Sequence, residues 1–319
     1  MQSLLPLLSL LTLALSSRPS LGLSSEDTST PSPFHLRLVQ ELGTALPSHF
    51  KNRDCPAIFS NITTNASSEW RTEPEWPPPR FIPKHLLRHF SMNGSAHIAM
   101  AYHLPNTFRD VYRHWKFSVI TDLISGKDKS DRCSGHWKHD CFKPLKRNDL
   151  FINGKVGLVV GSEYPWAESL LVRLGARQII TLERVRTNLD HPLMTAYTHD
   201  ELSDLYRSGR LPSFDFAFAY SSVEHEGLGK SGEGLDAYGD IVLMDKIHCL
   251  LKPGGVLFLA VPIGPDYLHW NTYRMYGRHR LPLLLEGWNL VNVLGNFTSL
   301  MPSKEKPSPK QPILILRKS

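Results

Sequence analysis

Three short segments of the sequence carry residues that could bind a small ligand and move a proton. They are the turn GSEYPW at 161–166, the acid Glu183, and the segment SSVEH at 221–225. Each one ends an apolar run that is typical of a buried strand. In open α/β sheets, ligands bind beyond the carboxyl ends of the strands, so we expect the three segments to meet at one site.

The first two segments have the spacing of a nucleoside site. A glycine at a strand end lets the backbone approach a ligand, and the start of the helix that follows offers free N–H groups. Glu183 comes 22 positions after Gly161, a spacing at which an acid can bind ribose hydroxyls. In the alternative interpretation, Gly161 and Glu183 are ordinary turn and surface residues. The cofactor-binding candidates are Gly161, Ser162, Glu163, Trp166, Glu183 and Ser222.

The composition of the first turn narrows the type of cofactor. The turn contains one glycine instead of G-x-G-x-x-G, and Glu163 puts negative charge where a pyrophosphate would lie. Both features disfavour a cofactor that carries phosphate. A nucleoside with a positively charged sulfonium fits better, and this predicts S-adenosylmethionine. Trp166 would then line the methionine side of the cofactor.

The third segment supplies the candidate catalytic residues. Methyl transfer to an oxygen benefits from a base that removes the acceptor's proton. His225 is the first candidate, because a histidine can accept a proton at physiological pH, and Glu224 is the second. Alternatively, either residue caps or braces the next loop. In YRMYGRHR, three arginines either hold an anionic acceptor or contribute surface charge: Arg274, Arg278 and Arg280.

The surrounding elements predict an α/β fold, a Rossmann-like, doubly wound and mostly parallel sheet. Strands are predicted at 155–161, 178–183, 214–222 and 256–262, with helices at 165–175 and 240–251 between them. We predict a tight turn at LKPGG (251–255) and a last strand at the apolar segment PILIL near the end. Upstream we expect a helix at 34–46, an extended Pro/Trp-rich strap at 69–83 laid on a larger domain, and mostly helix at 85–124.

Composition excludes several classes of protein. The chain has 319 residues, of which 41% are hydrophobic and 21% charged, so wholesale disorder is excluded. Its four cysteines are too few for a disulfide scaffold of this length. The net charge of +6 comes largely from residues 127–147 and the tail from Ser303. We therefore expect no nucleic-acid partner.

The N-terminus resembles a targeting segment. Residues 1–15 are apolar and uncharged, which is typical of a secretory signal peptide with cleavage after Gly22. A buried helix and an uncleaved anchor are the alternatives, and no other stretch is long enough to span a membrane. Four sequons agree with passage through the secretory lumen or with secretion: Asn61, Asn65, Asn93 and Asn296.

The cysteines leave the disulfide pattern open. Cys133 and Cys141 could close a small loop, whereas Cys55 and Cys249 cannot be assigned from the sequence. The same loop contains two histidines, His136 and His139, but their spacing with the cysteines matches no common zinc site, so we expect no metal.

Longer motifs carry a resemblance to known families. The order of elements resembles class I S-adenosylmethionine-dependent methyltransferases, and the detail resembles the domain of unknown function 268 family. The matching motifs are VVGSEYPWAE, LGA, TLE, SSVEHEGLGK, YGD, LLKPGGVLFLAVPIG and WNTYRMYGRHRLPLLLEGW, across about residues 153–293. At 230–234 the chain reads KSGEG, where the family has an Arg-Tyr-Gly-Asp-like stretch.

The resemblance implies a methyltransferase-like domain at 150–319, after a signal peptide at 1–22 and an extension at 23–149. Family members also occur in bacterial polysaccharide gene clusters, which implies a glycan or glycoconjugate acceptor. We therefore expect a methyltransferase of the secretory pathway that uses S-adenosylmethionine. The alternatives are a methyltransferase-like binding protein without catalysis and an enzyme acting on nucleotide sugars.

Overall fold

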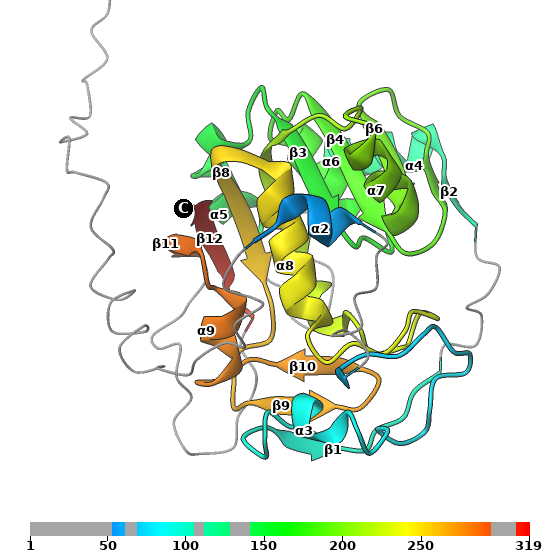
Figure 1. The fold of residues 1–319 in the computed structure, drawn as a ribbon. Helices are drawn as coiled ribbons and strands as arrows, with labels where there is room; N and C mark the ends of the chain where they lie inside the picture. Colours follow the sequence, from blue (N-terminus) through cyan, green and yellow to red (C-terminus); the bar gives the residue numbers. More distant parts are fainter. Residues whose placement is uncertain (1–52, 61–68, 105–111, 128–140, 295–310) are drawn as a thin grey trace, which may run out of the picture.

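A computed structural model describes residues 53–60, 69–104, 112–127, 141–294 and 311–319 of the chain. Its centre is a seven-stranded sheet with the strand order β11-β12-β8-β7-β3-β4-β6 (Figure 1). No helix in these residues is long and apolar enough to cross a membrane. The strands are β3 (Val156–Val160), β4 (Gln178–Glu183), β6 (Met194–Thr198), β7 (Phe214–Tyr220), β8 (Leu251–Ala260), β11 (Trp288–Leu294) and β12 (Ile313–Lys318).

The sheet is mostly parallel, as the sequence predicts. β3 runs parallel to β4 and β7, β4 to β6, and β7 to β8. β12 is antiparallel to both β8 and β11, so it is the one reversed strand of this sheet. All four predicted strands are present, and PILIL contributes to β12. The predicted LKPGG turn lies inside β8, where the register with β7 shifts and Gly254 has a φ of +71°.

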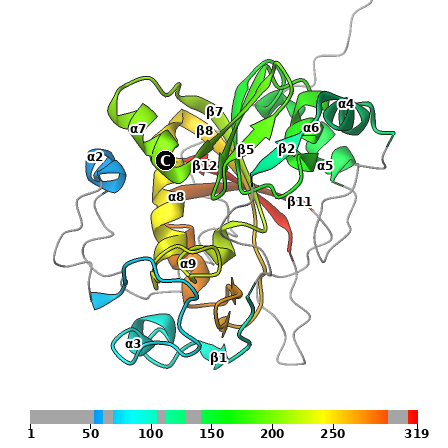
Figure 2. The ribbon, with the colours of Figure 1, turned by 90° about the vertical axis from the view of Figure 1, so that its right-hand side faces the viewer.

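Helices cover both faces of the sheet (Figure 2). α6 (Trp166–Arg173) and α4 (Phe117–Ser125) lie on one side, and α7 (His199–Arg207) and α8 (Gly239–Leu250) on the other. Alternate residues of β3 face the two sides: Leu158 packs in the core that contains α8, and Val159 in the core that contains α6. The chain is therefore doubly wound around two apolar cores.

A second, smaller sheet lies beyond the end of β8 (Figure 1). It consists of β1 (His97–Ala99), β9 (Tyr267–His269) and β10 (Tyr273–Met275), in the order β1-β9-β10. The remaining short elements are α2 (Cys55–Phe59), α3 (Leu87–Phe90), β2 (Arg113–Trp115), α5 (Phe142–Lys146), η3 (Asp149–Phe151), β5 (Thr187–Leu189), η4 (Val223–His225) and α9 (Arg280–Leu284).

The prediction of mostly helix at 85–124 is wrong. Two helices, α3 and α4, occupy part of this stretch, but β1 pairs with β9 and β2 pairs with β5, both in parallel. The strand partners lie far away in the sequence, so local periodicity does not reveal them. β6 and β11 were not predicted for a related reason: each mixes buried with half-buried or exposed residues and gives no continuous apolar run.

The predicted strap at 69–83 contains no helix or strand over residues 72–83, and it is attached to residues beside the small sheet and to the loop before α8. Arg71 forms an antiparallel bridge with Asp236. The hydroxyl of Tyr102 donates to the Pro78 carbonyl at 2.6 Å, and the indole N–H of Trp270 donates to the Pro79 carbonyl at 3.1 Å.

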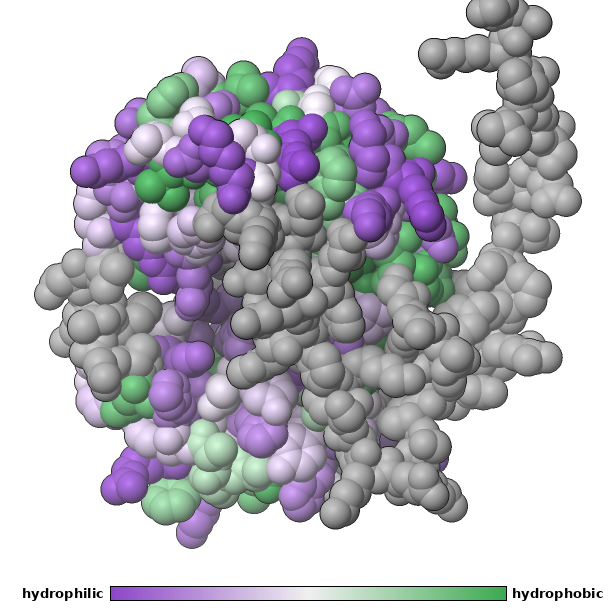
Figure 3. All heavy atoms as spheres, turned by 180° about the vertical axis from the view of Figure 1, so that it is seen from behind, coloured by the Kyte–Doolittle hydropathy of each residue, from purple (hydrophilic) through white to green (hydrophobic). Residues whose placement is uncertain are grey.

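Seen from behind, hydrophilic and hydrophobic residues are interspersed over the coloured surface (Figure 3).

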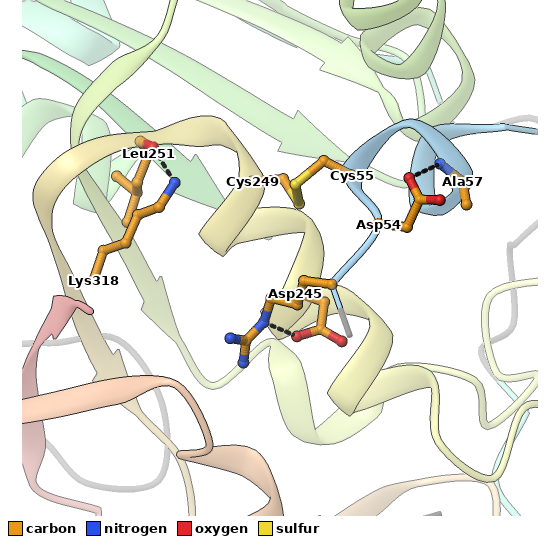
Figure 4. Close-up of a disulfide and its surroundings, with 8 residues drawn as sticks. Asp54, Cys55, Ala57, Asp245, Cys249, Leu251 and Lys318 are labelled. Carbon is orange, nitrogen blue, oxygen red and sulfur yellow. Dashed lines mark hydrogen bonds and ion pairs between the residues drawn. A yellow bond between two sulfur atoms is a disulfide. The ribbon is translucent and has the colours of Figure 1, made fainter. Parts of the chain in front are cut away.

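A disulfide joins the N-terminal extension to the sheet domain (Figure 4). Cys55 on α2 bonds to Cys249 on α8, across 194 positions of sequence. Arg53 pairs with Asp245 on the same helix, so two interactions attach α2 there. Cys141 is also disulfide-bonded. Its expected partner Cys133 lies outside the described residues, as do His136, His139, the helix predicted at 34–46, the signal peptide, and the sequons Asn61, Asn65 and Asn296.

Candidate functional site

The three predicted segments lie together at one edge of the large sheet. β3, β4 and β7 are neighbours and run in parallel, so their carboxyl ends meet. The N–H of Gly161 donates to the Leu182 carbonyl at 2.9 Å, and the N–H of Ser162 donates to Glu183 Oε1 at 2.5 Å. The segment after β7 lies on the other side of the first turn, where Ser222 approaches Gly161.

Gly161 is exposed and occupies a position that only glycine fits. Its φ is +67°, in the left-handed region that side chains disfavour. A Cβ atom added there would lie 2.8 Å from the Cβ of Ser222. Its lack of a side chain therefore keeps the first turn and the end of β7 close together and leaves backbone accessible to a ligand.

Glu183 is 5% exposed at the end of β4, and both of its oxygens have partners. Oε1 accepts the N–H of Ser162, and Oε2 lies 3.3 Å from a guanidinium nitrogen of Arg113 on β2. Burial raises the pKa of Glu183 to about 7, although the Ser162 N–H and Arg113 oppose this change. The charge of the exposed Glu163 raises the pKa slightly further.

Sequence reasoning missed a second buried carboxyl group at this site. Glu168 on α6 is 1% exposed and accepts hydrogen bonds from the hydroxyls of Thr181 and Ser162, each at 2.9 Å. Burial raises its pKa to about 7. The sequence signal that could have found it is the position of Glu168 between Trp166 and Leu170 in a predicted helix. The structure buries nearly all of the first two turns of this helix.

The segment after β7 holds two buried polar atoms without partners. Ser221 has a φ of +53°, and its hydroxyl donates to Glu224 Oε1 at 2.8 Å. The other oxygen of Glu224 and the hydroxyl of Ser222 are buried and have no hydrogen-bond partner in the described part of the chain. Burial raises the pKa of Glu224, and the nearby His225 opposes the rise. Such unpaired buried atoms are costly, so each calls for a partner that the described residues do not supply.

The ring of His225 is held in place through one of its nitrogens. Its Nδ1 lies 2.5 Å from the Thr272 carbonyl, so in the neutral ring Nδ1 carries the hydrogen and Nε2 presents a lone pair. Nε2 is 3.9 Å from Glu224 Oε1, and the histidine side chain is 34% exposed. Glu224 is 1% exposed and lies next to His225; its role as the second candidate base stays a prediction.

Trp166 has a packing role beneath the site. It is 8% exposed, and its ring meets those of Phe218 and Tyr220 edge to face, at centroid distances of 5.9 and 5.4 Å. These contacts leave little of the indole for a cofactor. The structure thus places Trp166 in the core next to the first turn and not on the wall of the site.

Two of the three predicted arginines are buried, which corrects both interpretations offered for them. Arg280 donates to the two oxygens of Asp240 at 2.6 and 2.8 Å, and Arg274 donates to the Asp236 carbonyl at 3.0 Å. Burial alone would raise the pKa of Asp240, but Arg274 and Arg280 outweigh it and lower the pKa. Arg278 is exposed. The buried pair supports the fold through Asp240, and both arginines also line a small cavity together with Asp266 and Tyr267.

A charged group next to the site was also missed. Arg184 follows Glu183 and pairs with Glu226 and, at 3.4 Å, with Glu233. Glu233 belongs to the KSGEG loop and accepts the N–H groups of Gly229 and Ser231 at 3.0 and 2.8 Å. The acid of this unusual loop therefore braces its own backbone.

Part of the chain matches a known protein family. Residues 154–307 match the profile of a family described as "Caenorhabditis protein of unknown function, DUF268". This match covers just under half of the chain and includes the GSEYPW and SSVEHEGLG motifs on which the resemblance rests. No curated protein sequence gives a significant match.

Solved structures resemble the chain only distantly. An S-adenosylmethionine-dependent methyltransferase of Mesorhizobium loti is 14% identical, covers 55% of this chain and 96% of its own, and has a TM-score of 0.37. The N-methyltransferase NodS of Bradyrhizobium japonicum is 13% identical, with coverages of 56% and 93% and a TM-score of 0.36. The fold class therefore rests on the sheet itself: a Rossmann-like, class I methyltransferase type of sheet with one reversed strand.

Proposed function

We propose that the chain is an S-adenosylmethionine-dependent methyltransferase of the secretory pathway that acts on a hydroxyl of a glycan or glycoconjugate. In this proposal residues 150–319 form the catalytic domain, 23–149 an extension and 1–22 a signal peptide. The observation that carries the proposal is the meeting of Gly161, Glu183 and Ser222 at the carboxyl edge of three neighbouring parallel strands.

The residues at this edge fit the cofactor. The hydroxyl of Ser222 is a buried donor without a partner among the described residues, and Gly161 presents accessible backbone beside it. Each oxygen of Glu183 has a second lone pair that can accept a ribose hydroxyl. The bound cofactor would supply an electrophilic methyl group on sulfur. The protein's own contribution is to hold the partners in line and to remove a proton.

We assign removal of the proton of the acceptor hydroxyl to His225. Thr272 fixes the ring through Nδ1, so Nε2 can accept the proton of the acceptor hydroxyl as its oxygen takes the methyl group. The imidazolium that results has Glu224 Oε1 at 3.9 Å, and a carboxylate at this distance stabilises the charged ring. His225 is thus the proposed base and Glu224 a positioning residue.

Two features support the secretory location. None of the described cysteines is free, and disulfides of this kind persist in oxidising compartments. Asn93 is exposed in a turn with a φ of +55°, so its sequon is accessible to glycosylation. The signal peptide and the other three sequons remain predictions from the sequence.

Cofactor titration tests the proposal. Calorimetry on the purified, folded chain should give saturable heats with S-adenosylmethionine and with its demethylated product. Absence of heat at millimolar concentrations of both would overturn the enzyme proposal.

That outcome would favour a second candidate, a methyltransferase-like binding protein without catalysis. The observation behind it is that Ser162 and Arg113 already occupy both oxygens of the acid expected to hold ribose.

A further inference from the structure

The small sheet carries a row of aromatic rings on one face, which we call the aromatic stripe: His97, Tyr267, His269 and Tyr273. His97 is directly opposite Tyr267 in the register of β1 and β9, and Tyr273 is opposite His269 in that of β10 and β9. Tyr267 and His269 are two positions apart and so share a face. Successive ring centroids lie 5.0, 4.7 and 4.4 Å apart along the row.

The aromatic stripe is not needed to build the core, because the other face of the sheet does that. Leu268 and Trp270 are 2% and 0% exposed, and the Trp270 ring packs edge to face on Phe90 of α3 at 5.4 Å. The side chains of the stripe point the other way: His97 is exposed and the other three are half-buried. Cross-strand aromatic pairs stabilise the small sheet, and four adjacent aromatic side chains on an outward face also form a surface suited to a ligand.

The polar atoms of the stripe are free to bind. None of its four side chains makes a hydrogen bond or ion pair with a residue that the structure describes. Partial burial raises the pKa of Tyr273 and lowers that of His269, which keeps both groups neutral at physiological pH. His269 and Tyr273 stack on each other at 4.4 Å, so the stripe offers ring edges and outward ring faces together with the polar atoms of its Tyr and His side chains.

The aromatic stripe adjoins, along the chain, the residue that contacts the proposed catalytic histidine. Tyr273 follows Thr272, and the carbonyl of Thr272 is the group that holds His225 Nδ1 at 2.5 Å. The N–H of Thr272 also donates to the His269 carbonyl at 2.9 Å. β10 and η4, which carry Tyr273 and His225, pack against each other.

The charged residues in and beneath the aromatic stripe indicate which class of ligand the stripe suits. The stripe contains no lysine or arginine, and the two arginines beneath it, Arg274 and Arg280, are paired with Asp240. A nucleic acid needs cations for its phosphates, so the stripe does not suit one. A neutral sugar fits, because its C–H groups meet the negative faces of the rings and its hydroxyls meet the Tyr and His polar atoms.

We propose that the aromatic stripe binds the neutral oligosaccharide of the acceptor and directs one of its hydroxyls to His225. The inference rests on the proposed methyl transfer, because the saccharide is taken to be the acceptor of that reaction. Saccharide binding itself can be measured without the cofactor.

The test is binding of the full-length chain to an array of neutral oligosaccharides, with heparin fragments and a single-stranded RNA included as anionic probes. The variants are Tyr267→Ala and His97→Ala. Because His97 is exposed on an edge strand, its replacement leaves the core intact. The matched control is Tyr112→Ala, an exposed tyrosine outside the stripe.

We expect the wild-type chain to bind a neutral glycan and each stripe variant to lose at least 10-fold in affinity, while Tyr112→Ala binds normally. Titration with S-adenosylmethionine should be unchanged in all variants, which separates this inference from the proposed function. Failure of the wild type to bind any neutral glycan would overturn the inference. RNA or heparin binding that the stripe variants abolish would also overturn it, in favour of an anionic ligand.

Discussion

The backbone N–H of Ser162 donates to Glu183 Oε1 at 2.5 Å, which ties the turn after β3 to the end of β4. The hydroxyl of the same serine donates to Glu168 Oε2 at 2.9 Å, so one residue connects two buried carboxyl groups. This connection explains why a serine follows the glycine at this turn. It also makes the site sensitive to the protonation of both acids.

Replacing Gly161 should damage the cofactor site specifically. Gly161→Ala would place a Cβ atom 2.8 Å from that of Ser222, and we expect at least a 10-fold loss of affinity for S-adenosylmethionine in calorimetry. Gly209→Ala is a matched control: Gly209 has the same φ of +67°, but no atom lies within 4 Å of an added Cβ. Both variants carry a similar backbone strain of about 1 kcal/mol. Equal cofactor affinity in the two variants would contradict the assignment.

Loss of the proposed base should affect turnover and leave binding intact. His225→Ala is expected to lower methyl transfer from radiolabelled cofactor to a panel of glycoprotein acceptors by about 10²–10⁴-fold. The affinity for the cofactor should stay within twofold of the wild type. His114→Ala, an exposed histidine on β2, serves as the control and should be fully active. Unchanged turnover in His225→Ala would refute the role of the base.

The stability of the protein should fall as pH rises towards neutrality, and Glu168 should contribute to this. In the unfolded chain its carboxyl group ionises near its usual pKa of 4.5, whereas in the folded chain it keeps its proton up to about pH 7. The folded state therefore binds more protons between these values, and stability is lost as pH rises through them, by about 3 kcal/mol for this group.

Glu168→Gln removes this ionisation and keeps the side chain's shape. Urea unfolding at pH 5 and pH 8 should show a smaller loss of stability in Glu168→Gln than in the wild type. Glu75→Gln, at an exposed position, should retain the wild-type difference. A Glu168→Gln variant with the full wild-type pH dependence would show that the buried carboxyl group does not titrate in this range.

The disulfide between Cys55 and Cys249 should be a large source of stability. It closes a loop of 194 positions, and the chain-entropy model gives about 5 kcal/mol for a loop of this length. We expect the double variant Cys55→Ala/Cys249→Ala to unfold at a correspondingly lower urea concentration. Adding reductant to this variant measures the separate effect of the Cys141 disulfide. Equal stability of variant and wild type would show that α2 is attached without the bond.

Asn93 should carry a glycan when the protein passes through the secretory lumen. Protein from a eukaryotic host should migrate faster after N-glycanase treatment, and Asn93→Gln should show a smaller shift because one exposed sequon is lost. Ser91→Ala, in the same turn but outside the sequon, is the control. A wild-type chain that N-glycanase does not alter would contradict both the sequon and the secretory location.

Sequence patterns predicted the elements that are buried on both sides. The strand at 178–183 was predicted with the bounds that β4 has, and the helix at 165–175 contains α6. The patterns failed where an element is half-exposed or pairs with a distant one, as for β11 and for β1. The same reason hid Glu168: its helix was predicted, but the two hydroxyls that satisfy the carboxyl group come from other elements.

The sequence by itself determined the buried strands and helices of the sheet domain, the resemblance to a family, and the three segments at the strand ends, because these depend on local periodicity and short motifs. Only the tertiary structure decided what each side chain does. It buried Trp166, Arg274 and Arg280, paired Glu183 with Arg113, and aligned the aromatic stripe from three separate strands. The physical reason is that burial, pKa and hydrogen-bond partners depend on which distant residues come within a few ångströms, and a linear pattern does not contain that information.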